Sequence, residues 1–514
     1  MTDVHVPELF NAATYFVDRN LDEGREDRVA IEFQDQALTY KQVARRVNQT
    51  GNALRELGVE IETRVMMIVL DSPEFAFCFF GAMKIGAVPV PVNTLLKASD
   101  YRTLLNDSRA RVLVISAELV PVIEPIVTDL EYIRHIVVVG ETDQHTSFHA
   151  LITGKSDELE AARTSRDDVA FWLYTSGTTG VFRAAVHLHH DMVHYTELYA
   201  RGILDICQED RTFSIAKLFF AYGLGNALYF PFAVGATTIL HPGRPDPASV
   251  FAVVDRHRPT IFYGVPTAYA AMLNAAEQGA SVDMHSVRVG VSAGEALPAN
   301  IYQRWLDRFG VRILDGIGST EILHIFLSNR LHDARPGSSG KVVPGYDAKI
   351  VDDALQPVSQ GEIGNLMISG DSICAYYWNK HDSTRWAIKG EWMRTGDKYH
   401  QDADGYFWYD GRGDDMLKVG GIWVSPTEVE SAVSEHPAVL ECAVVGAEDS
   451  DTLVKPKAYV VTKSGSDAGT ELAQSIQEFV KGRIAPYKYP RWVEFIDELP
   501  KTATGKIQRY RLRE

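Results

Sequence analysis

A short segment rich in hydroxyl groups is the first candidate for chemistry in this chain. Residues 174–180 read Tyr-Thr-Ser-Gly-Thr-Thr-Gly and follow the apolar run 169–173. Hydroxyl donors and free backbone N–H groups at the end of a strand suit a polyphosphate, and Arg183 adds a cation beside them. The spacing is neither that of a Walker A loop nor that of a GxGxxG dinucleotide fingerprint. Taken alone, the segment fits an anion-binding loop and an ordinary Ser/Thr-rich turn equally well.

The elements that must position this loop follow an alternating pattern. Short β-branched runs alternate with amphipathic segments, which predicts strands at 64–70, 111–116 and 135–140 and helices at 74–84 and 119–130. The same alternation returns with strands at 237–240 and 260–264 and helices at 247–258 and 266–277. Strand, helix, strand in this order predicts parallel α/β sheets.

The pattern changes twice toward the C-terminus. Residues 337–371 contain short strands broken by Gly and Pro, which predicts a small β-rich lobe. Beyond the glycines at 411 and 413, we expect strands at 440–446 and 457–463 and a helix at 471–484, a unit of ordinary domain size. The sequence therefore predicts an α/β protein. Its large N-terminal domain, residues 1–413, consists of layered α/β subdomains with the β-rich lobe, and a small mobile α+β C-terminal domain spans residues 414–514.

Composition excludes several classes of function. The 514 residues include 51 Lys and Arg against 68 Asp and Glu, a formal charge of −17, and no basic run. Nucleic acid and anionic membranes are therefore poor partners. The first ten residues are not a secretory signal, and Lys84 interrupts the longest apolar stretch, so we expect a soluble cytoplasmic protein. The four cysteines form no CxxC pair and are expected to be reduced core thiols.

Four histidines after the hydroxyl-rich segment raise the question of a metal. They are His187, His189, His190 and His194, and the last two have the i, i+4 spacing of a helix. No HExxH glutamate accompanies them. We therefore favour structural roles for these side chains over a zinc site.

Six segments, in this order along the chain, resemble the motifs of the adenylate-forming superfamily. That superfamily includes acyl-CoA and aryl-CoA ligases, luciferases and the adenylation domains of peptide synthetases. The segments are residues 174–183, 292–298, 315–321, 395–397, 411–421 and 500–506, and the resemblance covers essentially the whole chain.

The resemblance implies a site for ATP and Mg²⁺. Lys506, Thr320 and Glu321 correspond to the catalytic positions, with Glu321 holding Mg²⁺ and Thr320 touching phosphate. Asp397 would bind both ribose hydroxyls, and Arg412 the ribose. The remaining residues implied to bind ATP or AMP are Thr175, Ser176, Gly177, Thr178, Thr179, Arg183, Gly294, Glu295, Ala296, Asp315, Gly316 and Ile317.

The chemistry implied by the resemblance explains these residue types. Joining a carboxylate to the α-phosphate of ATP brings two anions together, so the site needs cations and positioned donors. Lys506 is a compact cation that can bridge the two groups. A thiol must then attack the adenylate, and the loop that carries Lys506 would stand in its way. The resemblance implies that the C-terminal domain rotates about Asp414 between the steps, and that coenzyme A (CoA) enters past Phe220, Gly420 and Gly421.

Three segments point to an aromatic acid. Residues 10–19, 217–226 and 322–329 are similar to the benzoate-CoA ligase branch, including the 2-aminobenzoate-CoA ligases. That likeness implies an acid pocket lined by Phe220, Ala221, Tyr222, Gly318, His324 and Ile325. No Asp or Glu lies between residues 211 and 230 to meet an α-ammonium group, which disfavours α-amino acids. An aromatic amine is largely neutral at pH 7, so 2-aminobenzoate stays open, and His324 could donate to or accept from an ortho substituent.

The sequence departs from the superfamily pattern in two places. Phe182-Arg183-Ala184 stands where Pro-Lys-Gly is usual, and Ile317 stands where many members have an aromatic ring. Arg keeps the positive charge but is not an ammonium point charge. We therefore expect that Arg183→Lys keeps or raises the rate of pyrophosphate release.

Three functions remain open at this level. The first is an aryl-CoA ligase that uses ATP, Mg²⁺, CoA and benzoate or a small substituted benzoate. The second is an aryl-adenylating enzyme that loads the phosphopantetheine of a carrier protein. The third is a non-catalytic ligand-binding relative, against which the retained Thr320, Glu321, Asp397, Arg412 and Lys506 argue. Either a monomer or a homodimer is compatible with the sequence.

Overall fold

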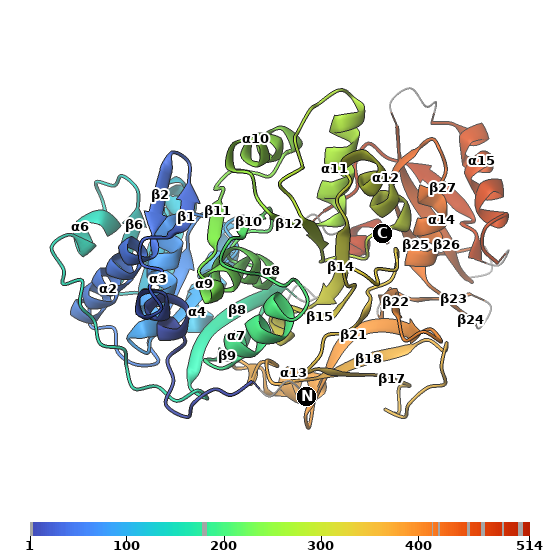
Figure 1. Ribbon diagram of the computed structural model, residues 1–514. Coiled ribbons are helices and arrows are strands. Elements are labelled where there is room, and N and C mark those ends of the chain that lie inside the picture. Colours follow the sequence, from blue (N-terminus) through green and yellow to red (C-terminus); the bar gives the residue numbers. More distant parts are fainter. Residues whose placement is uncertain are drawn as a thin grey trace.

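The computed structural model of the chain is shown in Figure 1. It describes residues 4–176, 182–413, 415–419, 422–449, 453–463, 468–485, 488–501 and 507–513, with the backbone alone at residues 176, 418, 422 and 423. Among the described residues, no helix is both long and apolar enough to cross a membrane.

The largest sheet has nine strands and a parallel centre. Its order is β16 (Lys341–Val342), β15 (Ile325–Ser328), β14 (Ile313–Gly318), β13 (Val289–Ser292), β12 (Ile261–Gly264), β10 (Arg211–Ser214), β11 (Thr237–Leu240), β1 (Val29–Phe33) and β2 (Gln36–Thr39). The strands β14, β13, β12, β10, β11 and β1 are parallel. At one edge of the sheet β15 and β16 are antiparallel, and at the other edge β2 is antiparallel. Helices α10 (Pro247–His257), α11 (Pro266–Glu277) and α12 (Ala299–Phe309) connect these strands, which confirms the predicted α/β layering.

A second sheet is parallel throughout. Its order is β4 (Val88–Pro91), β3 (Arg64–Ile68), β5 (Val112–Ser116), β6 (His135–Val139) and β7 (Thr146–Ser147). The helices of this region are α2 (Tyr40–Glu56), α3 (Pro73–Lys84), α4 (Ala98–Ser108) and α6 (Phe148–Ile152). A capping box at Thr39 and Gln42 begins α2.

The predicted helix over 119–130 is wrong. The segment forms two 3₁₀ pieces, Ala117–Leu119 and Glu124–Asp129, on either side of the short α5 (Val120–Ile123). Pro121 and Pro125 lack the N–H groups that a continuous helix would use, so the turns cannot merge into one helix.

A hairpin carries the hydroxyl-rich segment. Strand β8 (Val169–Ser176) pairs antiparallel with β9 (Phe182–Leu188), and β19 (Tyr376–Tyr377) pairs with the other edge of β9. Residues 174–176 are therefore part of the strand, and the connection between β8 and β9 lies outside the described residues.

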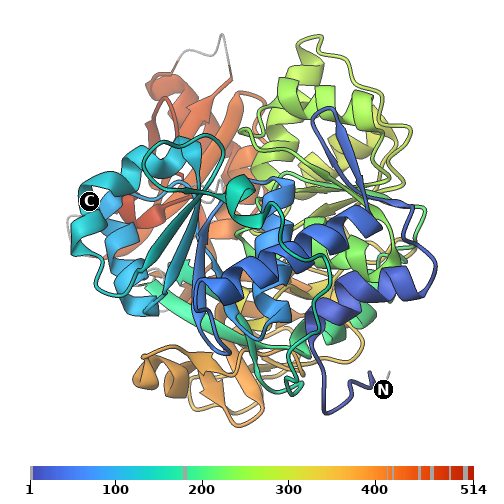
Figure 2. The ribbon, with the colours of Figure 1, turned by 90° about the vertical axis from the view of Figure 1, so that its left-hand side faces the viewer.

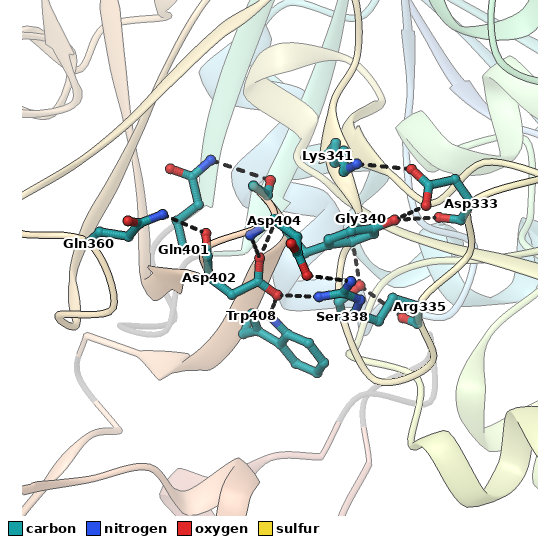
Figure 3. Close-up of polar contacts among 12 residues, drawn as sticks. Asp333, Arg335, Ser338, Gly340, Lys341, Gln360, Gln401, Asp402, Asp404 and Trp408 are labelled. Carbon is teal, nitrogen blue, oxygen red and sulfur yellow. Dashed lines mark hydrogen bonds and ion pairs between the residues drawn. The ribbon is translucent and has the colours of Figure 1, made fainter.

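The β-rich lobe extends further along the chain than the sequence predicts, to Arg412. It consists of β17 (Asp347–Val351), β18 (Gly364–Ser369), β20 (Ile388–Lys389), β21 (Trp392–Gln401) and β22 (Phe407–Arg412), with α13 (His381–Ala387) beside them. Figure 3 shows how the turn between β21 and β22 is fixed. Asp402 Oδ2 accepts hydrogen bonds from Arg335 (2.7 Å) and from the Trp408 indole (2.9 Å), which ties the lobe to the segment before β16.

The last hundred residues form a separate α+β layer. Its elements are β23 (Leu417–Val419), β24 (Ile422–Val424), α14 (Pro426–Ser434), β25 (Val439–Glu448), β26 (Val454–Thr462), α15 (Thr470–Lys481), β27 (Trp492–Phe495) and the 3₁₀ turn η8 (Arg509–Leu512). Apolar residues such as Val429, Val444 and Ile476 form a core of its own. Figures 1 and 2 both show this unit, in orange to red, above the β-rich lobe.

Short helices surround the hairpin and the large sheet. They are η1 (Thr14–Asp18), α1 (Arg19–Asp22), α7 (Asp191–Tyr195), η4 (Thr196–Arg201), α8 (Ala221–Leu224), η5 (Gly225–Tyr229), α9 (Phe230–Val234) and η6 (Thr320–Ile322). The cysteines follow the prediction in part: Cys78, Cys374 and Cys442 are buried, whereas Cys207 is exposed, and all four are unpaired thiols.

Candidate active site

The hairpin places Arg183 beside the hydroxyl-rich strand. Thr175 and Arg183 are directly paired across β8 and β9. The Arg183 guanidinium carbon lies 5.8 Å from the centroid of the Tyr377 ring, within the range of a cation–π contact. Gly177, Thr178, Thr179 and the Ser176 side chain lie outside the described residues. The structure thus describes the two ends of the predicted phosphate loop, residues 174–176 and 182–183.

Tyr377 links this hairpin to the predicted magnesium ligand. Its hydroxyl donates a 2.8 Å hydrogen bond to Glu321 Oε1. Burial, with a further contribution from the Glu321 carboxylate, raises the pKa of Tyr377, so the hydroxyl stays a donor. Arg183 and Glu321 therefore both contact Tyr377. Tyr377 was not among the predicted site residues, because an isolated Tyr has no spacing signal.

The side chain of Glu321 fits a magnesium ion. Tyr377 engages one carboxylate oxygen, and among the contacts of the described residues Oε2 has no hydrogen-bond or ion-pair partner. Mg²⁺ prefers one or two carboxylate oxygens together with water and phosphate. Glu321 and Thr320 lie on the single turn η6, which the Ser319 hydroxyl caps by accepting a hydrogen bond from Ile322 N.

Two predicted nucleotide segments lie at the carboxyl ends of neighbouring parallel strands. Ser292 at the end of β13 pairs with Asp315 on β14, so Gly294, Glu295 and Ala296 leave the sheet next to Asp315, Gly316 and Ile317. Ligands in open parallel sheets bind at such ends.

Asp315 lies inside this arrangement and is wholly buried. Its Oδ2 accepts a hydrogen bond from Leu297 N over 3.2 Å, and Asn329 holds its backbone carbonyl through both N (2.9 Å) and Nδ2 (3.0 Å). Burial raises the pKa of Asp315 to about 7, because the charged form loses water.

The C-terminal unit touches the large unit beside these strands. The N–H of Ile507 donates a 3.0 Å hydrogen bond to Glu295 Oε1. An antiparallel bridge joins Lys501 to Ile507. Lys506 itself lies outside the described residues, and its chain neighbour is anchored at a predicted nucleotide-binding residue.

Asp397 and Arg412, both predicted to hold the ribose, form an ion pair. They are directly opposed on β21 and β22, and Arg412 Nη1 lies 3.0 Å from Asp397 Oδ1. The Asp397 carboxylate raises the pKa of Arg412. Gly396, within β21, has φ +80°, a backbone conformation that favours glycine. The predicted pivot Asp414 lies outside the described residues, and the next residue, Asp415, pairs with Arg513.

The predicted acid-pocket residues come from α8 and from the paired strands β14 and β15. Ala221 and Tyr222 begin α8, and Gly318 pairs with Ile325 across β14 and β15. The His324 ring centroid lies 5.3 Å from that of Tyr222. A Cβ on Gly318 would lie 2.2 Å from the His324 carbonyl oxygen, so backbone packing alone requires glycine here.

His324 is neutral in this environment. Burial lowers its pKa to about 3. Its Nε2 lies 3.0 Å from Asn226 Oδ1, which accepts a hydrogen bond from the ring N–H. The Tyr222 hydroxyl donates within the protein, to the carbonyls of Gly264 and Val291, and therefore offers the pocket its ring only.

The predicted entry for CoA is described in part. Phe220 is half-buried at the start of α8, and its ring lies 4.2 Å from that of Phe219. Gly420 and Gly421 lie outside the described residues.

The four histidines have structural partners. His187 contacts Asp191, His189 accepts a hydrogen bond from Ala12 N, and His190 contacts the carbonyls of Arg166 and Asp371. His194 lies 3.7 Å from Asp371. In the part of the chain that the structure describes, no three His, Cys, Asp or Glu side chains are grouped as metal ligands.

Comparisons with known proteins agree with the order of the motifs. The model of the AMP-binding enzyme family matches residues 17–378, and that of the AMP-binding enzyme C-terminal domain matches residues 428–506. The benzoate–CoA ligase of Thauera aromatica is 51% identical over 512 residues, covering 99% of this chain and 97% of that protein.

Two solved structures have the same fold throughout. The anthranilate CoA ligase AuaEII in complex with anthranoyl-AMP superposes with a TM-score of 0.95 at 46% identity, covering 99% of this chain and 97% of that one. A benzoate CoA ligase from Burkholderia xenovorans LB400 gives a TM-score of 0.90 at 44% identity, covering 98% of this chain and 100% of that one.

Proposed function

Because the chain belongs to the AMP-binding enzyme family, we propose that it is an aromatic-carboxylate–CoA ligase. It activates benzoate, or a substituted benzoate such as 2-aminobenzoate, with ATP to an aryl-adenylate, and then forms aryl-CoA and AMP. The observation that carries this proposal is the 51% identity, over nearly the whole of both chains, to a benzoate–CoA ligase. The likeness to an anthranilate CoA ligase supports the inclusion of 2-aminobenzoate.

In the first step, a carboxylate oxygen of the acid attacks the α-phosphorus, and the bond to pyrophosphate breaks. The hairpin loop, Thr320 and Arg183 hold the phosphates, and Lys506 bridges the carboxylate and the α-phosphate. Glu321 holds Mg²⁺, which when bound neutralises phosphate charge. Tyr377 supports this role, because it fixes one oxygen of Glu321.

The nucleotide lies across the ends of β13 and β14. Asp397 accepts hydrogen bonds from the ribose hydroxyls, and its ion pair with Arg412 keeps the carboxylate charged and oriented. Ile317 gives the adenine an apolar wall without ring stacking.

The acid binds between α8 and the turn after η6. The Tyr222 ring and Ile325 form apolar walls suited to one aromatic ring. His324 is neutral, so it adds hydrogen-bonding capacity at this position without a charge. An α-ammonium group would have no carboxylate between residues 211 and 230 to meet.

In the second step, the CoA thiol attacks the acyl carbon and AMP leaves. We propose that residues 414–514 rotate about Asp414 to open the path past Phe220, Gly420 and Gly421. The separate apolar core of the C-terminal unit supports its motion as a body.

The test is to supply benzoate, ATP and Mg²⁺ with either CoA or a phosphopantetheine-bearing carrier protein and to read the masses of the products. We expect aryl-CoA and AMP. Aryl transfer to the carrier protein alone would favour the carrier-loading enzyme, and nucleotide binding without turnover would favour a non-catalytic relative.

A further inference from the structure

The turn η6, which carries Thr320 and Glu321, is held by three hydrogen bonds from outside. Thr320 O lies 2.8 Å from His187 Nε2, Glu321 O accepts from Cys374 N over 2.7 Å, and Ile322 O accepts from the Ser372 hydroxyl over 2.9 Å. Each successive carbonyl of the turn is thus satisfied by a residue distant in sequence. A single 3₁₀ turn has little rigidity of its own, so these donors fix where its side chains point.

His187 differs from the other two donors because its side chain is itself oriented by a carboxylate. A carbonyl oxygen only accepts, so Nε2 carries a proton that it donates to Thr320 O, and the contact between Nδ1 and a carboxylate oxygen needs a second proton. The other ring nitrogen, Nδ1, lies 2.7 Å from Asp191 Oδ2, and that same oxygen accepts a hydrogen bond from Leu188 N over 3.1 Å. The His187 and Asp191 side chains are both wholly buried.

The ring plane is fixed as well. His187 on β9 is paired with Phe171 on β8, and the two rings stack at 5.2 Å with 19° between their planes. With both nitrogens held and one face covered, the imidazole has one orientation, and that orientation is aimed at Thr320.

We propose that His187, held by Asp191, is a positioning residue for adenylate formation, which sets the turn that presents Thr320 and Glu321 to the phosphates and the metal. This inference rests on the proposed function for the roles of those two residues. Without the imidazole, Thr320 O keeps only the N–H of Leu323 at the end of the same turn (3.2 Å) and loses its one contact to a distant element, so the turn can shift. A displacement of about 1 Å in a catalytic group can cost about a hundredfold in rate.

His190 provides a matched control. Its Nε2 lies 3.1 Å from the other oxygen of the same carboxylate, Asp191 Oδ1. Its other side-chain contacts go to Asp167, to the carbonyls of Arg166 and Asp371 and to the His194 ring, none of which belongs to η6. A change at His190 removes an imidazole from Asp191 and leaves the donor to Thr320 in place.

The test compares the variants His187→Leu, His187→Gln and His190→Gln in the two half-reactions. For His187→Leu we expect a loss of about thirtyfold or more in kcat/KM for MgATP, with thiolysis of supplied aryl-adenylate by CoA within about threefold of the parent. His187→Gln should recover much of the loss, because its amide nitrogen reaches about as far as Nε2. His190→Gln should stay within about threefold in both steps.

Equal losses of His187→Leu in both half-reactions, or an unchanged kcat/KM for MgATP, would overturn the proposal. Calorimetric binding of MgATP to the parent and to His187→Leu gives a readout that does not depend on turnover, with weaker binding by the variant expected. If the parent protein releases no pyrophosphate with any aromatic acid, the proposed function fails. Equal calorimetric affinities would instead refute the role of His187.

Discussion

The N–H of Ile507 donates a 3.0 Å hydrogen bond to Glu295 Oε1, which joins the C-terminal unit to the segment that follows β13. Glu295 belongs to a predicted nucleotide segment, and Ile507 directly follows the predicted catalytic lysine. A contact at this point fits the proposed first half-reaction, in which Lys506 is proposed to reach the α-phosphate. The same contact has to break if the C-terminal unit rotates for the second step.

Lys506→Ala should abolish adenylate formation and largely spare thiolysis of supplied adenylate. The lysine is proposed to stabilise charge only while the carboxylate meets the α-phosphate, and loss of such a group costs about a hundredfold to a thousandfold in rate. Lys501→Ala is the control, because this nearby lysine pairs with Glu441 on the surface. Pyrophosphate release and thioester formation are measured separately, and equal losses in both steps would reject the assigned role.

Arg183→Lys should keep or raise pyrophosphate release. The Arg183 guanidinium lies 5.8 Å from the Tyr377 centroid, near the outer limit of a cation–π contact, so its loss should cost no more than about 0.5–1 kcal/mol. A lysine keeps the positive charge beside the phosphate loop. Initial rates at saturating acid and varied MgATP measure the effect, and a large loss would show that the planar guanidinium has a fitted role.

Asp397→Asn should raise KM for ATP by about tenfold or more and leave KM for the acid unchanged. The change removes the charge from the hydrogen bonds that Asp397 is proposed to make to the ribose, and hydrogen bonds to charged groups contribute about 1.5–3 kcal/mol. It also weakens the 3.0 Å contact that orients Arg412. The surface variant Asp353→Asn, on the same lobe, should leave both constants unchanged. A rise in KM for the acid alone would contradict this assignment.

Asp315→Asn should stabilise the protein more at pH 8 than at pH 5. Burial raises the folded-state pKa of Asp315 from 3.8 to about 7, so between these values the folded state binds more protons than the unfolded state. The free energy of unfolding therefore falls as pH rises from about 4 to 7, by up to about 4 kcal/mol at this residue. Denaturant midpoints of parent and variant at the two pH values measure it, and an equal difference at both would refute it.

The alternating pattern predicted the parallel strands β3, β5, β6, β11 and β12 and the helices α3, α10, α11 and α15, because buried parallel strands are short β-branched runs that the sequence makes visible. It left the strands β1, β4, β10, β13 and β14 and the helices α2, α4 and α12 unpredicted. It failed at 119–130, where the apolar periodicity outweighed Pro121 and Pro125 although those prolines stop a continuous helix. The pattern also predicted a β-rich lobe that ends at residue 371, whereas the last strand of the lobe ends at Arg412.

The candidate site was predictable as segments but not as contacts. Motif order indicated that Ser292 and Asp315 belong to one site, and the register of β13 and β14 pairs them. Tyr377 gave no signal, and His187 was noted only as one of four histidines expected to have structural roles. Their contacts to Glu321 and Thr320 depend on the packing of distant segments. The role of Gly318 was likewise visible only once β15 was placed against β14.

The most direct measurement is pyrophosphate release with ATP and Mg²⁺ across benzoate, hydroxybenzoates, 2-aminobenzoate, phenylacetate and medium-chain fatty acids, with product masses read after CoA is added. We predict release confined to benzoates, with masses of the corresponding aryl-CoA thioesters and AMP. Release driven by fatty acids with no response to any benzoate, or no release with any acid on the panel, would contradict an aromatic-carboxylate–CoA ligase.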